Sequence, residues 1–234
     1  MNLRFLSLAL VLAVSACAHT PPDDPADPLE PVNRAMFRFN RTADRYVLRP
    51  VAKSYGKVMP DVAQRGVSNF FNNLKEPRNI VNGLLQGKPM QAASDTGRFL
   101  LNSTAGFVGL MDVATDAGMP RHDEDFGQTL GRYGVGPGWY LMLPILGPTT
   151  NRDLLGRGGD YYTGTSAYVE SEVNLPMNAL DLVDIRSRYL SADSLIDNAI
   201  DPYIFVRTAY LQQRLGKVYD GNPPRELMYG DEGE

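Results

Sequence analysis

The chain has 234 residues, of which 23 are basic and 27 acidic, so its formal net charge at pH 7 is −4. A hydrophobic content of 43% with 21% charged residues is typical of a globular protein and excludes a disordered one. The acidic balance argues against nucleic acid as a partner, because binding to phosphates requires an excess of basic side chains.

Residues 1–16 have the organisation of a bacterial export signal. Arg4 precedes an apolar run that ends at Val14, and the small residue Ala16 comes directly before Cys17, the only cysteine. The apolar run is too short to span a bilayer as a helix. A small residue before a lone cysteine predicts a lipoprotein signal, with cleavage before Cys17 and attachment to a membrane through its acyl chains. The alternative is an ordinary cleaved signal that leaves a thiol without a disulfide partner.

Composition divides the rest of the chain into three parts. Residues 17–27 carry the lipidated cysteine and a polar, Pro-rich tether. Residues 28–219 form the helical domain, in which no stretch reaches the length of a transmembrane helix. Residues 220–234 are polar, end in acidic residues, and are expected to form a loose tail.

Most predicted elements are helices, with proline and glycine near their expected ends. The segments expected in chain order are a helix over 30–48, a helix that opens at Pro60, a short helix between Pro77 and Gly87, a helical segment over 89–114, a strand over Tyr140–Ile145, and a helix capped by Asp201 with Pro202 first and Gly216 beyond its end. Pro144 makes this segment either an edge strand or no strand. We therefore expect a mainly α protein with at most one small β-hairpin.

The first helix carries an arginine stripe within an arc of roughly 80°. Its members are Arg34, Arg38, Arg41, Arg45 and Arg49. The opposite side is apolar and holds Met36, Phe39, Ala43, Tyr46 and Val47. Such a helix can lie among lipid headgroups with its apolar side in the membrane. The alternative is an ordinary helix whose apolar side meets the protein core while the arginines are solvated.

Residues 125–148 form a second unusual segment, rich in glycine and proline yet strongly apolar. Its glycines have the wrong spacing for a phosphate-binding loop. An apolar segment without helical structure must be buried in protein or line a cavity at membrane depth. Gly136 and Gly138 are expected where a side chain would clash.

Catalysis and metal binding have little support in the sequence. There is no G-x-S-x-G motif, and His122 is the one plausible general base. The cluster His122–Asp125 could hold a calcium ion, but we favour a solvated acidic turn that caps the next segment. We expect no catalytic residue, no metal and no cofactor.

Several sequence blocks together resemble the MlaA/VacJ family of outer-membrane lipoproteins. The resemblance covers nearly all of residues 27–215. The blocks are Asp27–Arg34, Ser68–Pro77, Leu84–Gly87, Arg98–Ser103, Phe126–Gly131 followed by Leu143–Pro144, and Asp201–Tyr203.

The resemblance implies a helical ring with an amphipathic central channel, embedded in the inner, periplasmic leaflet of the outer membrane. It implies removal of mislocalised phospholipid from the outer leaflet, transfer to a soluble periplasmic MlaC-like carrier, and association with a trimeric porin. The candidate channel lining is Val135, Gly136, Pro137, Gly138, Trp139, Leu141 and Leu143. The alternatives are a porin-associated structural lipoprotein without its own channel, and a lipid-acting hydrolase.

Overall fold

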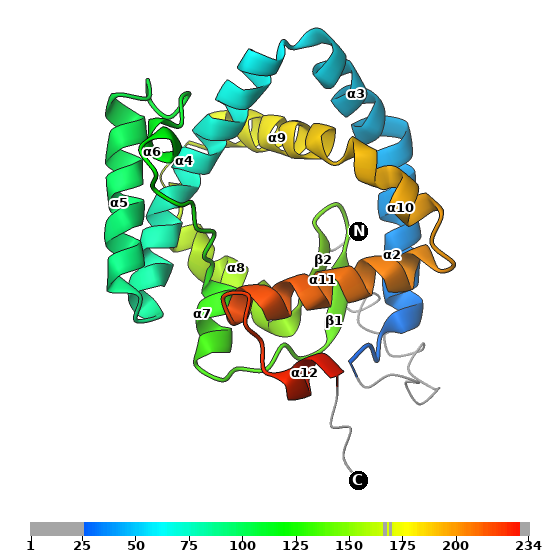
Figure 1. Ribbon diagram of the computed structural model, residues 1–234. Coiled ribbons are helices and arrows are strands. Elements are labelled where there is room, and N and C mark those ends of the chain that lie inside the picture. The colour runs from blue at the N-terminus through cyan, green and yellow to red at the C-terminus, as the bar shows by residue number, and fades with distance from the viewer. Residues whose placement is uncertain (1–25, 166–167, 169, 230–234) are drawn as a thin grey trace, which may run out of the picture.

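The computed structural model describes residues 26–165, 168 and 170–229 and is mostly helical (Figure 1). The helical elements are α2 (Glu30–Ala43), the π turn η1 (Asp44–Leu48), α3 (Arg49–Val58), α4 (Asp61–Leu85), α5 (Pro89–Thr104), α6 (Val113–Asp116), α7 (Phe126–Arg132), α8 (Asn151–Thr163), α9 (Ser171–Arg188), the 3₁₀ turn η3 (Leu190–Ala192), α10 (Asp193–Asp197), α11 (Pro202–Val218) and α12 (Arg225–Tyr229). Strands β1 (Tyr140–Leu143) and β2 (Gly147–Thr150) pair antiparallel, with Tyr140 opposite Thr150. The expected mainly α fold with one small hairpin is confirmed.

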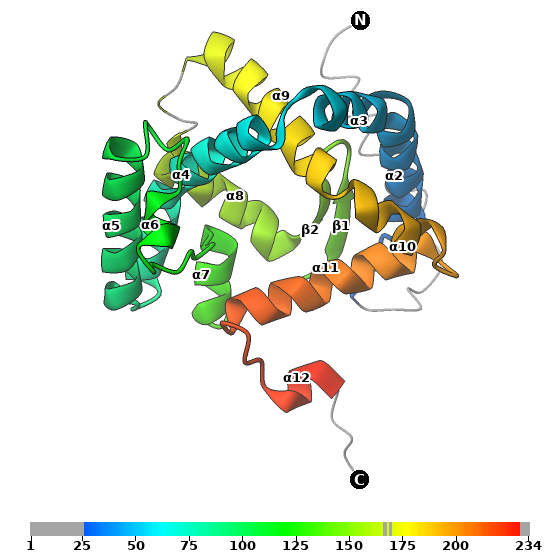
Figure 2. The same cartoon turned by 45° about the horizontal axis from the view of Figure 1, so that its top comes forward.

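The helices follow one another around a ring (Figure 1). Around the ring, α2 and α3 are followed by α4, then by α7 and α8, and then by α11, whose neighbour α10 lies beside α2. Helix α5 packs on the outer side of α4, and α9 contacts both α3 and α4. The ring persists in the tilted view of Figure 2, and the β1–β2 hairpin stands inside it, in contact with α2 and α11.

Buried positions in this ring are mainly polar. The buried hydrophobic cluster is small: Tyr140, Met142 and Tyr203, with partly buried neighbours from α2 and α11. By contrast, α4 buries Asn73, Glu76, Asn79 and Asn82 along one side, whereas Leu84 on the same helix is 57% exposed. Polar side chains therefore outnumber hydrophobic ones among the buried residues that the structure describes, and directional bonds take the place of a large apolar core.

Arg98 is the centre of one buried network, between α4, α5 and α6. Its guanidinium donates to both carboxylate oxygens of Asp112, at 2.9 and 3.1 Å, and to Glu76 at 3.4 Å. Asn102 also donates to Asp112, at 3.0 Å. Burial raises the pKa of Glu76 against the opposing effect of its bonds to Asn79 and Arg98. This network fixes the end of α5 relative to α4.

Arg214 is the centre of a second network, which ties α11 to α7 and α8. It donates to Asp125 at 2.8 Å and to Asp153 at 2.8 and 2.9 Å. Burial acts to raise the pKa values of both carboxyls, but the bonds and charge of Arg214 outweigh it and hold both below their usual range. Close approach of the helices demands glycine: a Cβ at Gly156 would lie 2.4 Å from the backbone nitrogen of Gly127.

Several expected boundaries are wrong, because tertiary contacts override local signals. Pro77 lies inside α4, which runs unbroken to Leu85, and Gly216 lies inside α11 rather than beyond its end. The first helical segment extends through η1 to Val58, with Pro50 accommodated in the first turn of α3, and the segment over 89–114 divides into α5, a loop and α6. The cap was predicted correctly: Asp201 accepts from the backbone of Tyr203 and Ile204, with Pro202 at the first position.

Two helices, α7 and α12, form where the sequence predicted none. Residues 126–132 of the apolar Gly/Pro stretch form α7, because the Asp125 side chain caps that helix through the backbone nitrogen of Gln128. The short helix α12 lies within the segment expected to be a loose tail. In the part of the chain that the structure describes, no helix is both long enough and apolar enough to cross a membrane.

The Arg214 network predicts a characteristic pH dependence. Because the folded pKa values of Asp125 and Asp153 are depressed, these groups stabilise the protein above their unfolded pKa of about 3.9, and that contribution is lost as the pH falls through their folded values. Arg214→Met removes the cation that lies between partly buried Asp125 and buried Asp153 and leaves Asp153 paired with Arg152, so it should cost about 3 kcal/mol near pH 7. The variant should recover part of this loss on acidification from pH 7 to 5, because protonation removes the buried charges.

The measurement is the free energy of unfolding in detergent as a function of pH, followed by circular dichroism. Arg157→Met, which removes an exposed arginine from α8, is the matched control and should change stability little. A constant difference between Arg214→Met and the parent protein across this pH range would contradict the assignment.

Candidate functional site

The predicted lipid-attachment residue, Cys17, lies outside the described residues. The first described residues are nonetheless tightly held. Asp27 is 1% exposed, accepts hydrogen bonds from Asn33 and Arg207 at 2.7 and 3.0 Å, and also accepts from the Tyr203 hydroxyl. The tether therefore ends at a fixed point on α2 and α11.

The arginine stripe divides into paired and exposed members. Arg34 pairs with Asp201 at 2.8 Å, Arg49 pairs with Asp193 at 2.8 Å, and Arg41 pairs with Asp197. Two of these acids lie on α10 and Asp201 is the N-cap of α11. These pairs connect the first helical segment to α10 and the start of α11 and so help close the ring.

Arg38 and Arg45 are exposed, and so is part of the apolar side of the same helices. Tyr46 is 74% exposed and Val47 65%. Neither sequence interpretation describes this arrangement fully. Part of the stripe is engaged in the protein, while part of the apolar side faces outward.

Residues Val135–Trp139 of the candidate channel lining form an exposed, irregular segment that leads into β1. Gly138 has a φ of +67°, and a Cβ there would lie 3.0 Å from the side chain of Asn151, so glycine is required. At Gly136 a Cβ would meet nothing within 4 Å, so the expected clash is absent at that position. Trp139 is 51% exposed.

Leu141 and Leu143, the other two candidates, share one face of the hairpin. Side chains alternate along a strand, and the opposite face of β1 carries Tyr140 and Met142, which are buried against α2 and α11. Leu141 and Leu143 therefore project to the less covered side. Among the candidates, these two leucines therefore lie on the hairpin face that is turned away from α2 and α11.

The hairpin is held to α2 by two asparagines that the sequence analysis did not single out. Asn33 donates to the carbonyl of Tyr140 at 3.0 Å and accepts from the amide of Met142 at 2.8 Å. Asn40 does the same further along, donating to the carbonyl of Leu143 at 2.8 Å and accepting from the amide of Ile145 at 2.7 Å. The two side chains satisfy an edge strand as a neighbouring strand would. The sequence feature that could have identified them is their separation by seven residues, which puts both asparagines on one face of the helix.

The His122–Asp125 cluster caps the next segment as expected, through Asp125 at the start of α7, but it is not fully solvated. Glu124 is 4% exposed and accepts from Lys88 and Gln91, at 3.1 and 2.8 Å, and His122 Nδ1 lies 2.7 Å from Asp95. No three His, Cys, Asp or Glu side chains among the described residues are grouped so as to hold a metal ion. The cluster borders a polar depression of about 720 Å³ at the ends of α5, α7 and α11.

The described chain exposes many large hydrophobic side chains. They lie on most of its helices, among them Val58 at 78%, Leu155 at 71% and Leu175 at 75%. A soluble monomer rarely exposes large apolar areas, whereas a protein that contacts lipid or a partner does. Buried polar side chains and exposed apolar ones together indicate a protein built for an apolar surrounding.

Comparison with known proteins identifies relatives over most of the chain. The sequence profile of the family described as MlaA lipoprotein matches residues 25–217. The chain is 38% identical over 220 residues to the "Intermembrane phospholipid transport system lipoprotein MlaA" of Escherichia coli (strain K12), covering 91% of this chain and 88% of the relative. It is 36% identical over 224 residues to the protein of the same description from Haemophilus influenzae, covering 92% and 90%.

A solved structure described as "Structural basis for maintenance of bacterial outer membrane lipid asymmetry" is also similar. It superimposes with a TM-score of 0.76 at 40% sequence identity, over 84% of this chain and 99% of the other.

The asparagine contacts predict how the hairpin can be loosened. Asn33→Ala leaves the carbonyl of Tyr140 and the amide of Met142 unpaired, at about 1–3 kcal/mol, so the Met142 amide should exchange its hydrogen roughly tenfold to a hundredfold faster. Asn33→Asp should be worse than alanine, because it places a second carboxylate beside Asp27. Hydrogen exchange followed by mass spectrometry measures both effects. The control is Asn178→Ala, which alters an exposed asparagine on α9; equal protection of β1 in all variants would refute the prediction.

Proposed function

This chain belongs to the MlaA lipoprotein family, and from that membership we propose that it removes mislocalised phospholipid from the outer leaflet of the outer membrane and passes it to a periplasmic carrier. Its relatives are lipoproteins of an intermembrane phospholipid transport system. In this proposal the protein is attached through acylated Cys17, lies in the periplasmic leaflet, associates with a trimeric porin, and delivers lipid to an MlaC-like protein.

The observation that best supports this role is the combination of an apolar exterior with a ring-like arrangement of helices. An apolar exterior favours residence in hydrocarbon, which removes those side chains from water at about 25 cal/mol per Å². A ring with its own hairpin inside can present one surface to the bilayer and another to a lipid in transit. A purely structural anchor would need a surface for the bilayer but no surface for a lipid in transit.

We place the lipid path along the inner face of the hairpin. Leu141 and Leu143 supply apolar contact for acyl chains, and the exposed segment Val135–Trp139 continues it. Trp139 is suited to the region of a lipid headgroup, because a tryptophan ring has one polar edge. The exposed members of the arginine stripe, Arg38 and Arg45, are proposed to contact anionic headgroups.

The anchor is tested by Cys17→Ala. The variant should lose acylation, which mass spectrometry of the purified protein detects, and should move from the membrane fraction to the soluble periplasmic fraction or retain its signal. An unchanged mass and unchanged fractionation would show that Cys17 is not the site of attachment.

The path is tested by Leu143→Asp. An unpaired carboxylate against acyl chains costs several kcal/mol when it is desolvated. The free energy of lipid binding should therefore become less favourable by about 1–3 kcal/mol. Cells that carry the variant should accumulate outer-leaflet phospholipid and become sensitive to detergent, although the protein reaches the outer membrane at normal abundance. Lipid analysis of the detergent-purified parent protein should find intact phospholipid at a defined ratio.

The control is Met90→Asp, which places the same charge at an exposed position outside the ring on α5. Full complementation by Leu143→Asp at normal abundance would show that the hairpin face is not the path. Hydrolysed lipid in the purified parent protein would instead support an enzyme.

A further inference from the structure

The loop between α5 and α6, Ala105–Met111, is apolar and projects outward. Phe107 is 70% exposed, Val108 68%, Leu110 48% and Met111 55%, and the loop contains no ionisable side chain. A connecting loop in water is usually polar.

The backbone of this loop is held in a conformation that bulky residues avoid. Phe107 has a φ of +52° and Val108 a φ of +59°, two consecutive left-handed residues of which one is β-branched. Each such residue costs of order 1–3 kcal/mol and persists only where the surroundings enforce it. Asparagine or glycine would adopt this conformation more readily, yet large apolar residues occupy both positions.

Two features hold the loop backbone in this conformation: the Arg98 network and a close contact at Gly109. Asp112, which follows the loop, is held by Arg98 and Asn102, and Asn102 also accepts from the amide of Ala114 at 2.9 Å. A Cβ at Gly109 would lie 2.6 Å from the side chain of Asn73. The loop is therefore a rigid projection of α4 and α5.

Almost every backbone donor in the loop is satisfied within the protein. The amides of Ala105 and Gly106 donate to the carbonyl of Leu101, that of Val108 to Ser103, and that of Gly109 to Asn102. The amides of Leu110 and Met111 donate to carbonyls inside the loop, and Asn69 donates to the carbonyl of Leu110. An exposed loop in water needs no such arrangement, whereas backbone in hydrocarbon must satisfy its donors internally.

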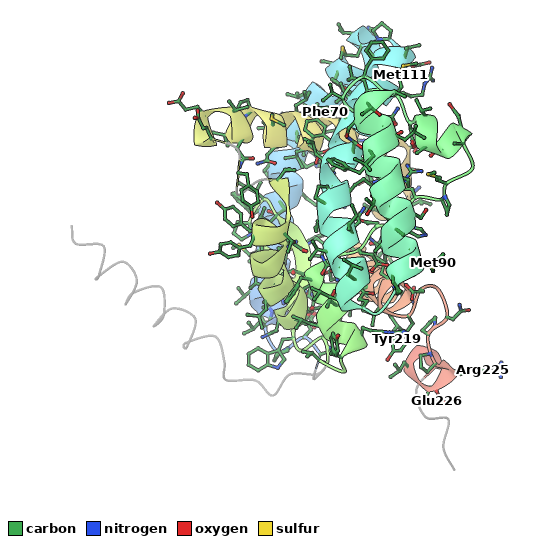
Figure 3. The ribbon with its side chains drawn as sticks, turned by 90° about the vertical axis from the view of Figure 1, so that its left-hand side faces the viewer. Phe70, Met90, Met111, Tyr219, Arg225 and Glu226 are labelled. Atoms are coloured by element: carbon green, nitrogen blue, oxygen red, sulfur yellow. The ribbon has the colours of Figure 1, made fainter. Side chains whose placement is uncertain are left out.

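The two ends of α5 differ in chemistry. Met90, near its start, lies beside Lys88 and Gln91, which border the polar depression shared with His122 and Lys217. Met111 lies beyond its other end, in the apolar loop. Figure 3 shows these two methionines toward opposite ends of α5, and the helix between them is roughly 24 Å long.

We propose that the α5–α6 loop is a preformed wedge that inserts among the acyl chains of the bilayer, while the Met90 end of α5 stays in water. The inference rests on the proposed residence of the protein in a membrane. The occupant is lipid rather than a partner protein, because the loop tip offers no polar side chain for specific pairing and has few free backbone donors. Its rigidity spares the entropy cost of ordering the loop on insertion.

Two single-cysteine labels on the acylated full-length protein test the wedge. Met111→Cys and Met90→Cys, each carrying an environment-sensitive fluorophore, are reconstituted into vesicles of phosphatidylethanolamine and phosphatidylglycerol. The label at 111 should be quenched several-fold more strongly by lipids with a quencher on the acyl chain, and the label at 90 by aqueous iodide. Equal quenching patterns at the two positions would overturn the proposal.

A third variant separates insertion from folding. Val108→Asn, made in the Met111→Cys background, suits the left-handed backbone, so the thermal unfolding temperature in detergent should be unchanged or higher. Acyl-chain quenching at 111 should nevertheless fall, because a polar tip resists hydrocarbon. Unchanged quenching with unchanged stability would overturn the wedge.

Two other outcomes are informative. Protection of the label at 111 that appears only after an outer-membrane protein is added, without acyl-chain quenching, would overturn lipid as the occupant and assign a protein. If the label at 111 stays open to iodide while the Met111→Cys protein still supports lipid asymmetry in cells, the wedge fails and the proposed function stands.

Discussion

The described part of this ring buries few hydrophobic side chains and many polar ones. The hydrophobic effect therefore cannot hold it together as it holds a globular domain. Buried arginines take over that role: Arg98 joins α4, α5 and α6, and Arg214 joins α7, α8 and α11. Each fixes the relative position of three helices by several charge-assisted bonds, which are directional and so specify one arrangement.

The same constraint explains the exterior. With polar groups engaged between helices, apolar side chains are left to face outward, as Val58 and Leu175 do. In water this distribution would promote aggregation, whereas in a lipid leaflet it costs nothing. The buried ion pairs also become more favourable when water is kept away from their surroundings, provided every partner remains in place. Fold and environment are thus mutually dependent.

Local signals in the sequence were sufficient wherever a local bond decides the structure. Asp201 and Pro202 start α11 as predicted, because capping involves only neighbouring residues. Pro77 was misjudged, because the contacts of α4 with α5 outweigh one missing hydrogen bond. Hydrophobicity is a poor guide to burial on the same helix, where Leu84 is 57% exposed and Asn79 is buried. The ring itself was predictable only from resemblance to a family, because no local pattern encodes closure.

The hairpin and the proposed membrane anchor meet at one point. The amide of Tyr140, the first residue of β1, donates to the carbonyl of Ala26 at 2.8 Å. The next residue, Asp27, is bound by Asn33 of α2 and by Arg207 of α11. Asn33 in turn holds β1. In the function proposed above, the bonds of Asp27 and Asn33 therefore link the first described residues, ten positions after the proposed attachment site Cys17, to the strand that carries Leu141 and Leu143.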